Sequence, residues 1–216
     1  TDEELITLLG DPNIYYRETA QRLLSERAND KTKLSLASII FDVDRDRAQR
    51  MHALWAIAGM GPVDESLLNR LLQLDSLGTS DDPLLFSWGV RLAGNNGEIG
   101  VPIADLVSEA KSHPSPIVRL QVAIAQHKIQ VGSAEEPIQS VKHPSWAIRA
   151  LLRALEGEES DSLLTHIVWQ NLEPLLEDHS AEFLEIVSEY DLKETPNLAK
   201  LMPRITERLL DRGEEE

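Results

Sequence analysis

The sequence predicts an all-α fold in which about five helix pairs stack as a right-handed superhelix, with further helices capping its C-terminal end. Three observations predict this fold. A short motif recurs along the chain, and apolar residues recur at helical spacing, as in Leu5, Leu8 and Leu9. No window shows the sustained alternation of apolar and polar residues that is typical of a strand.

The recurring motif is an aspartate or histidine followed six residues later by an arginine. Its four occurrences pair Asp11 with Arg17, Asp44 with Arg50, His113 with Arg119 and His143 with Arg149, and proline follows the first residue in three of them. A fifth unit with Ser87 in place of arginine fills the gap, so the markers at 17, 50, 87, 119 and 149 lie 33, 37, 32 and 30 residues apart. This period, with helical patterning alone, is typical of stacked helix pairs.

The chemistry of the motif explains both of its ends. The first residue can cap a helix while the proline occupies the first turn, where its missing N–H costs nothing. The arginine lies about one and a half turns into the helix, within reach of a loop carbonyl, a loop carboxylate or the neighbouring repeat. We therefore expect these eight residues to form a structural ladder that fixes the stacking angle.

The expected helices follow from this pattern in chain order. The first helices of the pairs are expected at 2–9, 31–41, 65–74, 101–111 and 135–142, and the second helices at 14–27, 47–60, 83–94, 115–131 and 145–155. The glycines at 59 and 61 and those at 94 and 97 are expected to end helices. Residues 1–156 are thus expected to form the repeats.

The C-terminal part, residues 157–216, is expected to cap the same superhelix. Between Arg153 and Lys193 lie 39 residues with eleven acids and no lysine or arginine. Helices are expected at 162–177, with Pro174 bending or breaking the end, and at 181–190 and 198–210. Terminal repeats are usually atypical because one of their faces meets water.

Composition narrows the classes of function. Lys and Arg number 21 against 37 Asp and Glu, which gives a net charge of −16 and makes a nucleic-acid or anionic-lipid ligand unfavourable. Cysteine is absent, so thiolate zinc sites and thiol nucleophiles are excluded. The longest uncharged run, 51–63, is too short to span a bilayer. Because the chain starts without methionine or signal peptide, we expect it to be part of a longer protein.

The chain resembles the HEAT-repeat family through the spacing of six residues from Asp or His to Arg. This resemblance implies a HEAT-like or ARM-type α-α superhelix. Residues 15–24, 50–61 and 168–175 are similar to the HEAT region of planctomycete-type membrane-bound dehydrogenases, large exported proteins that join a β-propeller, a HEAT segment and a cytochrome c module. The resemblance implies an extracytoplasmic or periplasmic segment of a multidomain redox protein. It carries no dehydrogenase activity onto this chain, which has no Cys-x-x-Cys-His haem motif and no propeller strands.

The remaining motifs predict no catalytic, cofactor or metal site. His113 and His143 hold equivalent positions in adjacent units, but helices pack roughly 8–10 Å apart and zinc ligands need about 2.0–2.1 Å. More simply, each histidine caps the following helix or takes the place of the aspartate of the first two units. No Gly-x-Ser-x-Gly elbow occurs, and the glycine-rich run at 94–100 lacks the Lys-Ser or Lys-Thr of a phosphate loop.

Three residues are candidates for contact with a protein partner. His52 lies between Arg50 and Trp55 and is interpreted either as a contact residue or as a histidine that bonds a neighbouring repeat. Trp146 and Trp169 are candidates for exposed contacts, since aromatic residues anchor interfaces. The other two tryptophans, at 55 and 88, lie among apolar helix positions and are expected to be buried.

These observations favour a non-catalytic scaffold or protein-interaction module. Its partners would be neighbouring modules of the parent chain or a separate protein, on the face formed by the second helices. One alternative is an accessory wall of a cofactor- or sugar-binding site in the parent enzyme, with His52 and Trp55 lining a pocket. Another is a free-standing bacterial HEAT adaptor.

The ladder hypothesis predicts that Arg50→Ala lowers the melting temperature, because an arginine that braces a loop or a neighbouring repeat stabilises the stack. A thermal melt of the variant beside the wild-type chain measures this. An unchanged melting temperature would show that Arg50 has no such role.

Overall fold

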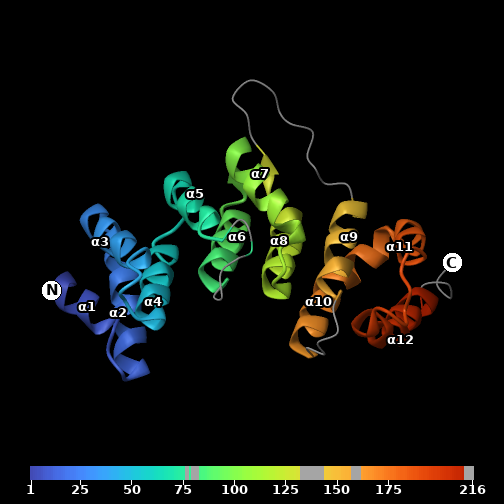
Figure 1. Ribbon diagram of the computed structural model, residues 1–216, viewed down its shortest axis with the longest axis horizontal. Coiled ribbons are helices and arrows are strands. Elements are labelled where there is room, and N and C mark those ends of the chain that lie inside the picture. Colours follow the sequence, from blue (N-terminus) through green and yellow to red (C-terminus); the bar gives the residue numbers. More distant parts are fainter. Residues whose placement is uncertain (76–77, 79–82, 132–143, 157–161, 212–216) are drawn as a thin grey trace. The chain divides into compact units, whose positions relative to one another are not determined.

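The computed structural model describes residues 1–75, 78, 83–131, 144–156 and 162–211. Over these residues the chain is helical, with twelve α-helices, one 3-10 turn and two strands of two residues each (Figure 1). It divides into two compact units, Thr1–Leu67 and Leu68–Glu216. The division expected after residue 156 lies inside the second unit, because one apolar core runs from α8 to α12 across it.

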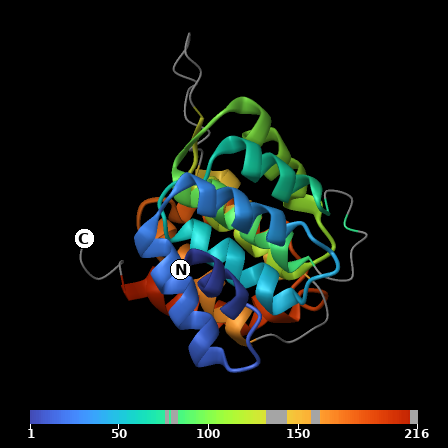
Figure 2. The ribbon, with the colours of Figure 1, turned by 90° about the vertical axis from the view of Figure 1, so that its left-hand side faces the viewer.

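The first unit contains α1 (Asp2–Leu8), α2 (Ile14–Arg27), α3 (Asp30–Ile40), α4 (Arg47–Ala58) and the first residues of α5 (Glu65–Gln73). α2 packs against α1 and α4, and α3 packs against α4 (Figure 2). Side-chain caps begin these helices: Asn13, Asn29 and Asp46 accept the N–H groups of Tyr15, Thr32 and Ala48 at 2.8 to 3.0 Å. The caps and the fully buried leucines of α2, α3 and α4 give each helix one fixed face.

One carboxylate ties the start of α1 to the end of α2 and the start of α3. Asp2 accepts hydrogen bonds from Arg27 at 2.5 Å, from Asn29 at 2.8 Å and from the Thr32 hydroxyl at 2.7 Å. These bonds, the Thr32 bond foremost, lower the pKa of Asp2 to about 2. The first helix pair is therefore closed by polar contacts at the end opposite to its loop.

The second unit continues with α6 (Leu84–Asn96), β1 (Glu98–Ile99), α7 (Val101–Glu109), the 3-10 turn Ala110–Ser112, α8 (Pro116–Lys128) and β2 (Gln130–Val131). It then contains α9 (Pro144–Ala154), α10 (Ser162–Asp178), α11 (Ser180–Val187) and α12 (Pro196–Asp211). β1 and β2 pair in parallel, with Glu98 opposite Gln130 and Ile99 opposite Val131. Each of these strands follows its helix closely, so the pairing joins the ends of α6 and α8.

The core of the C-terminal half lies between α8, α9, α10, α11 and α12. Its large buried members include Ile148, Trp169, Leu172, Phe183 and Ile205. Each helix contributes a stripe at helical spacing, and none of the five can cover its stripe without the others.

The sequence-based helices agree closely with these bounds. The expected helices outside 135–142 are confirmed, with ends that differ by at most three residues. The helix expected at 135–142 lies outside the described residues. Of the two outcomes expected at Pro174, the break is wrong, because α10 continues through this residue to Asp178, held by buried Leu172 and Leu176 on either side, while the bend stays a prediction. The two short strands were not expected.

None of the helices in the described ranges is both long enough and apolar enough to cross a membrane.

α6 and α8 approach each other most closely at Gly94. A Cβ at this position would lie 2.8 Å from the Ala125 Cα and 2.9 Å from its Cβ, which is closer than carbon atoms pack. Gly94 therefore serves the contact between the two helices and does not end α6, which runs on to Asn96 and ends at Gly97 with a φ of 77°.

We predict that Gly94→Ala destabilises the chain by about 1–3 kcal/mol, the usual cost of overpacking. Helix propensity alone predicts the opposite sign, since alanine is favoured over glycine by about 1 kcal/mol within a helix. Urea unfolding followed by circular dichroism separates the two. A variant as stable as the wild type, or more so, would contradict the close approach of α6 and α8.

Candidate functional site

Two of the four motif arginines make the same contact in different units. Arg17 Nη1 donates to the carbonyl oxygens of Asp11 and Pro12, at 2.7 and 2.9 Å. Arg119 Nη1 donates to the carbonyl oxygen of His113 at 3.0 Å and to the next one along the chain at 2.7 Å. Each guanidinium thus closes the loop that precedes its own helix.

The first residues of these two motifs are also equivalent. Asp11 Oδ1 accepts the N–H of Asn13 at 2.8 Å, and His113 Nδ1 accepts the N–H of Ser115 at 3.0 Å. Aspartate and histidine therefore do the same work in the turn, since each bonds the N–H two residues later.

The other two motifs differ. Arg50 Nε donates to the Ile40 carbonyl at 2.8 Å, ten residues back at the end of α3. The Asp44 carboxylate has no hydrogen bond or ion pair among the described residues, and α4 is capped by Asp46 instead. Arg149 pairs with Glu189. His143 lies outside the described residues.

His52 lies inside the first unit, 5% exposed, and not on its surface. Its Nε2 accepts a hydrogen bond from Arg17 Nε at 3.2 Å, so Nδ1 carries the proton and donates to Gln21 Oε1 at 2.7 Å. Burial, and then the charge of Arg17, lower its pKa. The interpretation as a histidine that bonds a neighbouring helix fits this geometry, and the interpretation as a partner contact does not.

Trp169 is also not an exposed contact. It is 3% exposed in the core of the second unit, with the guanidinium of Arg204 lying 4.6 Å from its ring centroid. The sequence showed Trp169 on α10 but not that α12 covers it. The side chain of Trp146 lies outside the described residues. Trp55 and Trp88, which were expected to be buried, are both half-buried.

A buried histidine–aspartate pair joins the loop before α8 to the end of α5. His113 Nε2 lies 3.2 Å from Asp75 Oδ2, and both side chains are 2% exposed. Phe86 stacks on the imidazole with centroids 5.3 Å apart. Because Nδ1 accepts the Ser115 N–H, Nε2 carries the proton, and neither nitrogen is left for a substrate. No pattern in the sequence indicated Asp75 as the partner of His113.

In the described ranges, no three histidine or acidic side chains are arranged to hold a metal ion.

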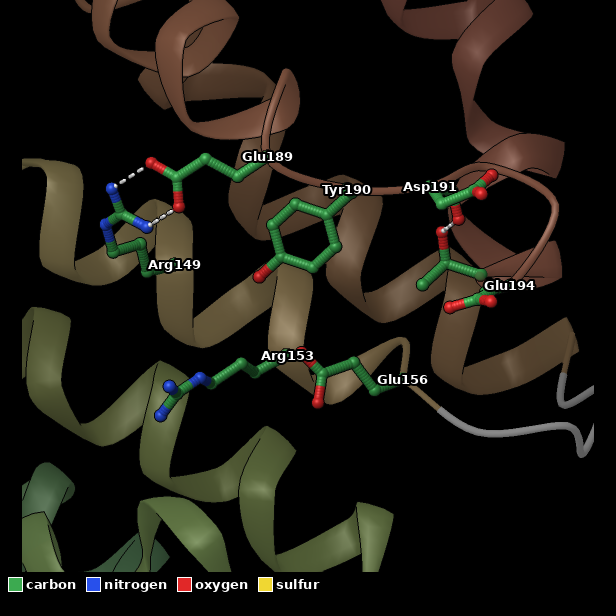
Figure 3. Close-up of a pocket in the computed structure, with 8 residues that line it drawn as sticks. Arg149, Arg153, Glu156, Glu189, Tyr190, Asp191 and Glu194 are labelled. Carbon is green, nitrogen blue, oxygen red and sulfur yellow. Dashed lines mark hydrogen bonds and ion pairs between the residues drawn. The ribbon is translucent and has the colours of Figure 1, made fainter.

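A pocket lies in the second unit, between the C-terminal end of α9 and the segment that joins α11 to α12. It encloses about 400 Å³. Its lining combines charged residues with one aromatic ring: Arg149, Arg153, Glu156, Glu189, Tyr190, Asp191, Glu194 and Thr195. Figure 3 shows Tyr190 between the Arg149–Glu189 pair on one side and Asp191 and Glu194 on the other.

Within the pocket, one cation is already neutralised. Arg149 donates two parallel hydrogen bonds to the Glu189 carboxylate, at 2.6 and 2.7 Å. This pairing lowers the pKa of Glu189 and raises that of Arg149. Both groups are solvent-exposed, so the pair orients the two side chains more than it stabilises the fold.

The remaining charges of the pocket are predominantly negative. The side chains of Glu156 and Glu194 make no hydrogen bond or ion pair within the described part of the chain, and Asp191 bonds only nearby backbone. Arg153 also lines the pocket, and in Figure 3 its guanidinium extends away from Glu156. Burial, and then Glu156, raise the pKa of Tyr190, so its phenol stays protonated and can donate a hydrogen bond. The arrangement is suited to a cationic group that lies against an aromatic ring.

Sequence reasoning placed Arg149 in the ladder but missed this pocket. Most of its lining comes from residues 189–195, a segment without any recognised motif. The acidic excess after Arg153 was the only signal that could have indicated it. Comparison of the chain with protein-family models, with curated proteins and with solved structures finds no match.

We predict that His113→Ala lowers the free energy of unfolding by about 3 kcal/mol, because it removes a turn acceptor and leaves the buried Asp75 carboxylate without its imidazole. His113→Asn should cost less, since its Oδ1 can accept the Ser115 N–H as Asp11 accepts that of Asn13. Urea unfolding of both variants measures the difference. Equal losses in the two would show that the turn bond contributes nothing.

Proposed function

We propose that this chain is a non-catalytic protein-interaction domain that binds a basic segment of another protein at the pocket between α9 and residues 189–195. The observation that carries the proposal is the pocket's composition: Glu156, Asp191 and Glu194, which form no ion pair among the described residues, share one pocket lining with a half-buried tyrosine ring. A lysine or arginine side chain can meet the carboxylates with its charged end and the ring with its stem.

The charge of the whole chain favours the same class of partner. At −16, the chain attracts basic surfaces at long range, and the pocket then supplies the local contacts. The volume of about 400 Å³ is suited to one or two side chains of a partner segment.

The HEAT-like superhelix is part of this proposal. It is supported by the repeated loop contact of Arg17 and Arg119 and by short helices that pack against the helix one or two places along the chain, as α8 does against α6 and α9. In such a stack the second helix of each pair carries the binding face, and α9, which supplies Arg149, Arg153 and the following Glu156, is a helix of this kind.

The resemblance to exported dehydrogenase-associated HEAT regions extends the proposal to compartment and context. On that basis we place the chain in an extracytoplasmic protein with further modules, where its basic partner is a neighbouring module or a separate protein. The binding proposal does not depend on this extension.

We predict that Glu156→Gln/Glu194→Gln weakens binding of a dye-labelled peptide of alternating lysine and serine by about three- to tenfold, as expected for the loss of two exposed charge contacts. Fluorescence anisotropy of the full chain at moderate ionic strength measures the affinity. Circular dichroism verifies that the variant is folded.

The matched control is Glu185→Gln/Glu207→Gln, which changes the net charge equally at two exposed positions outside the pocket. It should alter the affinity less than twofold. If both double variants weaken the peptide equally, the attraction comes from the overall charge and the pocket is not the binding site.

A further inference from the structure

A second, smaller pocket lies in the same unit between α6, α8 and α10. It encloses about 200 Å³. α6 contributes Arg91 and Asn95, α8 contributes Gln121, Ile124 and Lys128, and α10 contributes Ile167. No acidic side chain is part of this lining, although acids outnumber Lys and Arg by 37 to 21 in the chain.

The two cations of this pocket are not neutralised. Neither Arg91 nor Lys128 forms an ion pair among the residues that the structure describes. Lys128 Nζ donates one hydrogen bond, of 3.2 Å, to Asn95 Oδ1, and its other two N–H groups remain. The guanidinium carbon of Arg91 lies 4.7 Å from the centroid of the Trp88 ring.

This stacking prepares Arg91 for a carboxylate. A guanidinium that lies over an aromatic ring uses its face for the contact and keeps its N–H groups, which lie in its plane, available. Those N–H groups match the two oxygens of a carboxylate. Stacking also restricts the side chain, so less conformational entropy is lost when an anion binds.

The other lining residues of this pocket are suited to a ligand that carries apolar and hydrogen-bonding groups as well as a negative charge. Ile124 and Ile167 offer apolar surface between the cations, while Asn95 and Gln121 can bond a peptide backbone. Gly94 and Ala125 also line the pocket, and their contact is too close for any additional side chain and therefore holds α6 and α8 at one spacing.

We propose that this groove binds an acidic segment of a partner protein, with one carboxylate between Arg91 and Lys128 and an adjacent apolar side chain against Ile124 and Ile167. Charge complementarity within the groove selects the occupant: its lining holds two cations beside two isoleucines, and a peptide segment supplies both a carboxylate and an apolar side chain, whereas a nucleic-acid backbone supplies only the anion. The inference is independent of the pocket between α9 and residues 189–195, the carboxylate pocket, which is proposed to bind a ligand of opposite charge.

The test is fluorescence anisotropy of a dye-labelled peptide of alternating glutamate and leucine, titrated with the full chain. Saturable binding is expected, and Arg91→Gln/Lys128→Gln should weaken it at least tenfold. Arg91→Lys, which keeps the charge but loses the planar fork, should weaken it by a smaller factor. Replacing the leucines of the peptide by serine should also weaken binding, because the apolar contact is lost.

The matched control is Lys111→Gln/Lys193→Gln, which removes two exposed cations outside the groove and should change the affinity less than twofold. Circular dichroism verifies the fold of each variant. Absence of saturable binding, or equal weakening by the two double variants, would overturn the proposal. So would competition by inorganic phosphate at concentrations no higher than those of the unlabelled peptide, because the groove would then be a simple anion site.

Discussion

A guanidinium group that donates to two consecutive carbonyls of the loop before its own helix sets the geometry around α2 and around α8. These carbonyls belong to a turn and cannot be satisfied within a helix, and arginine supplies both partners from one planar group. The same side chains also reach the next helix pair. Arg17 Nε donates to His52 on α4, and Arg119 Nη2 donates to the carbonyl of Glu156, which follows α9. One residue type therefore fixes both the turn within a pair and the contact between pairs.

The carboxylate pocket depends on this arrangement. Glu156 presents its carbonyl to Arg119 and its carboxylate to the pocket, so the position of the pocket wall is linked to the loop before α8. On the other side, Tyr190 packs against the apolar core that α8 to α12 share. The charged lining of the pocket is therefore attached to the fold at two points, the Glu156 carbonyl and the Tyr190 ring. These attachments limit how far its carboxylates can move apart.

Much of the fold followed from local signals in the sequence. Helical periodicity and capping residues are properties of adjacent residues, and they placed most helices within a few residues of their ends. The six-residue spacing also indicated the loop contacts of Arg17 and Arg119, because the loop and the arginine belong to one short segment. Arg50 and Arg149 share that spacing but bond Ile40 and Glu189.

What the sequence could not supply depends on contacts between distant segments. Trp169 is covered by α12, and Asp75 meets a histidine 38 residues later. Strands of two residues have no detectable alternation, so the β1–β2 pairing left no pattern. The carboxylate pocket combines the end of α9 with residues from a segment more than thirty positions along the chain, and no motif connects the two.

The distribution of tryptophan over the two units has a practical meaning for how the chain unfolds. Residues 1–67 contain a single tryptophan, Trp55, whose ring meets the His52 imidazole edge-on at a centroid distance of 5.0 Å. The other three, at 88, 146 and 169, belong to the second unit. Because each unit is compact by itself, the two can lose structure at different denaturant concentrations. The indole emission of a variant that retains only Trp55 would follow the first unit alone, and the backbone signal would follow both.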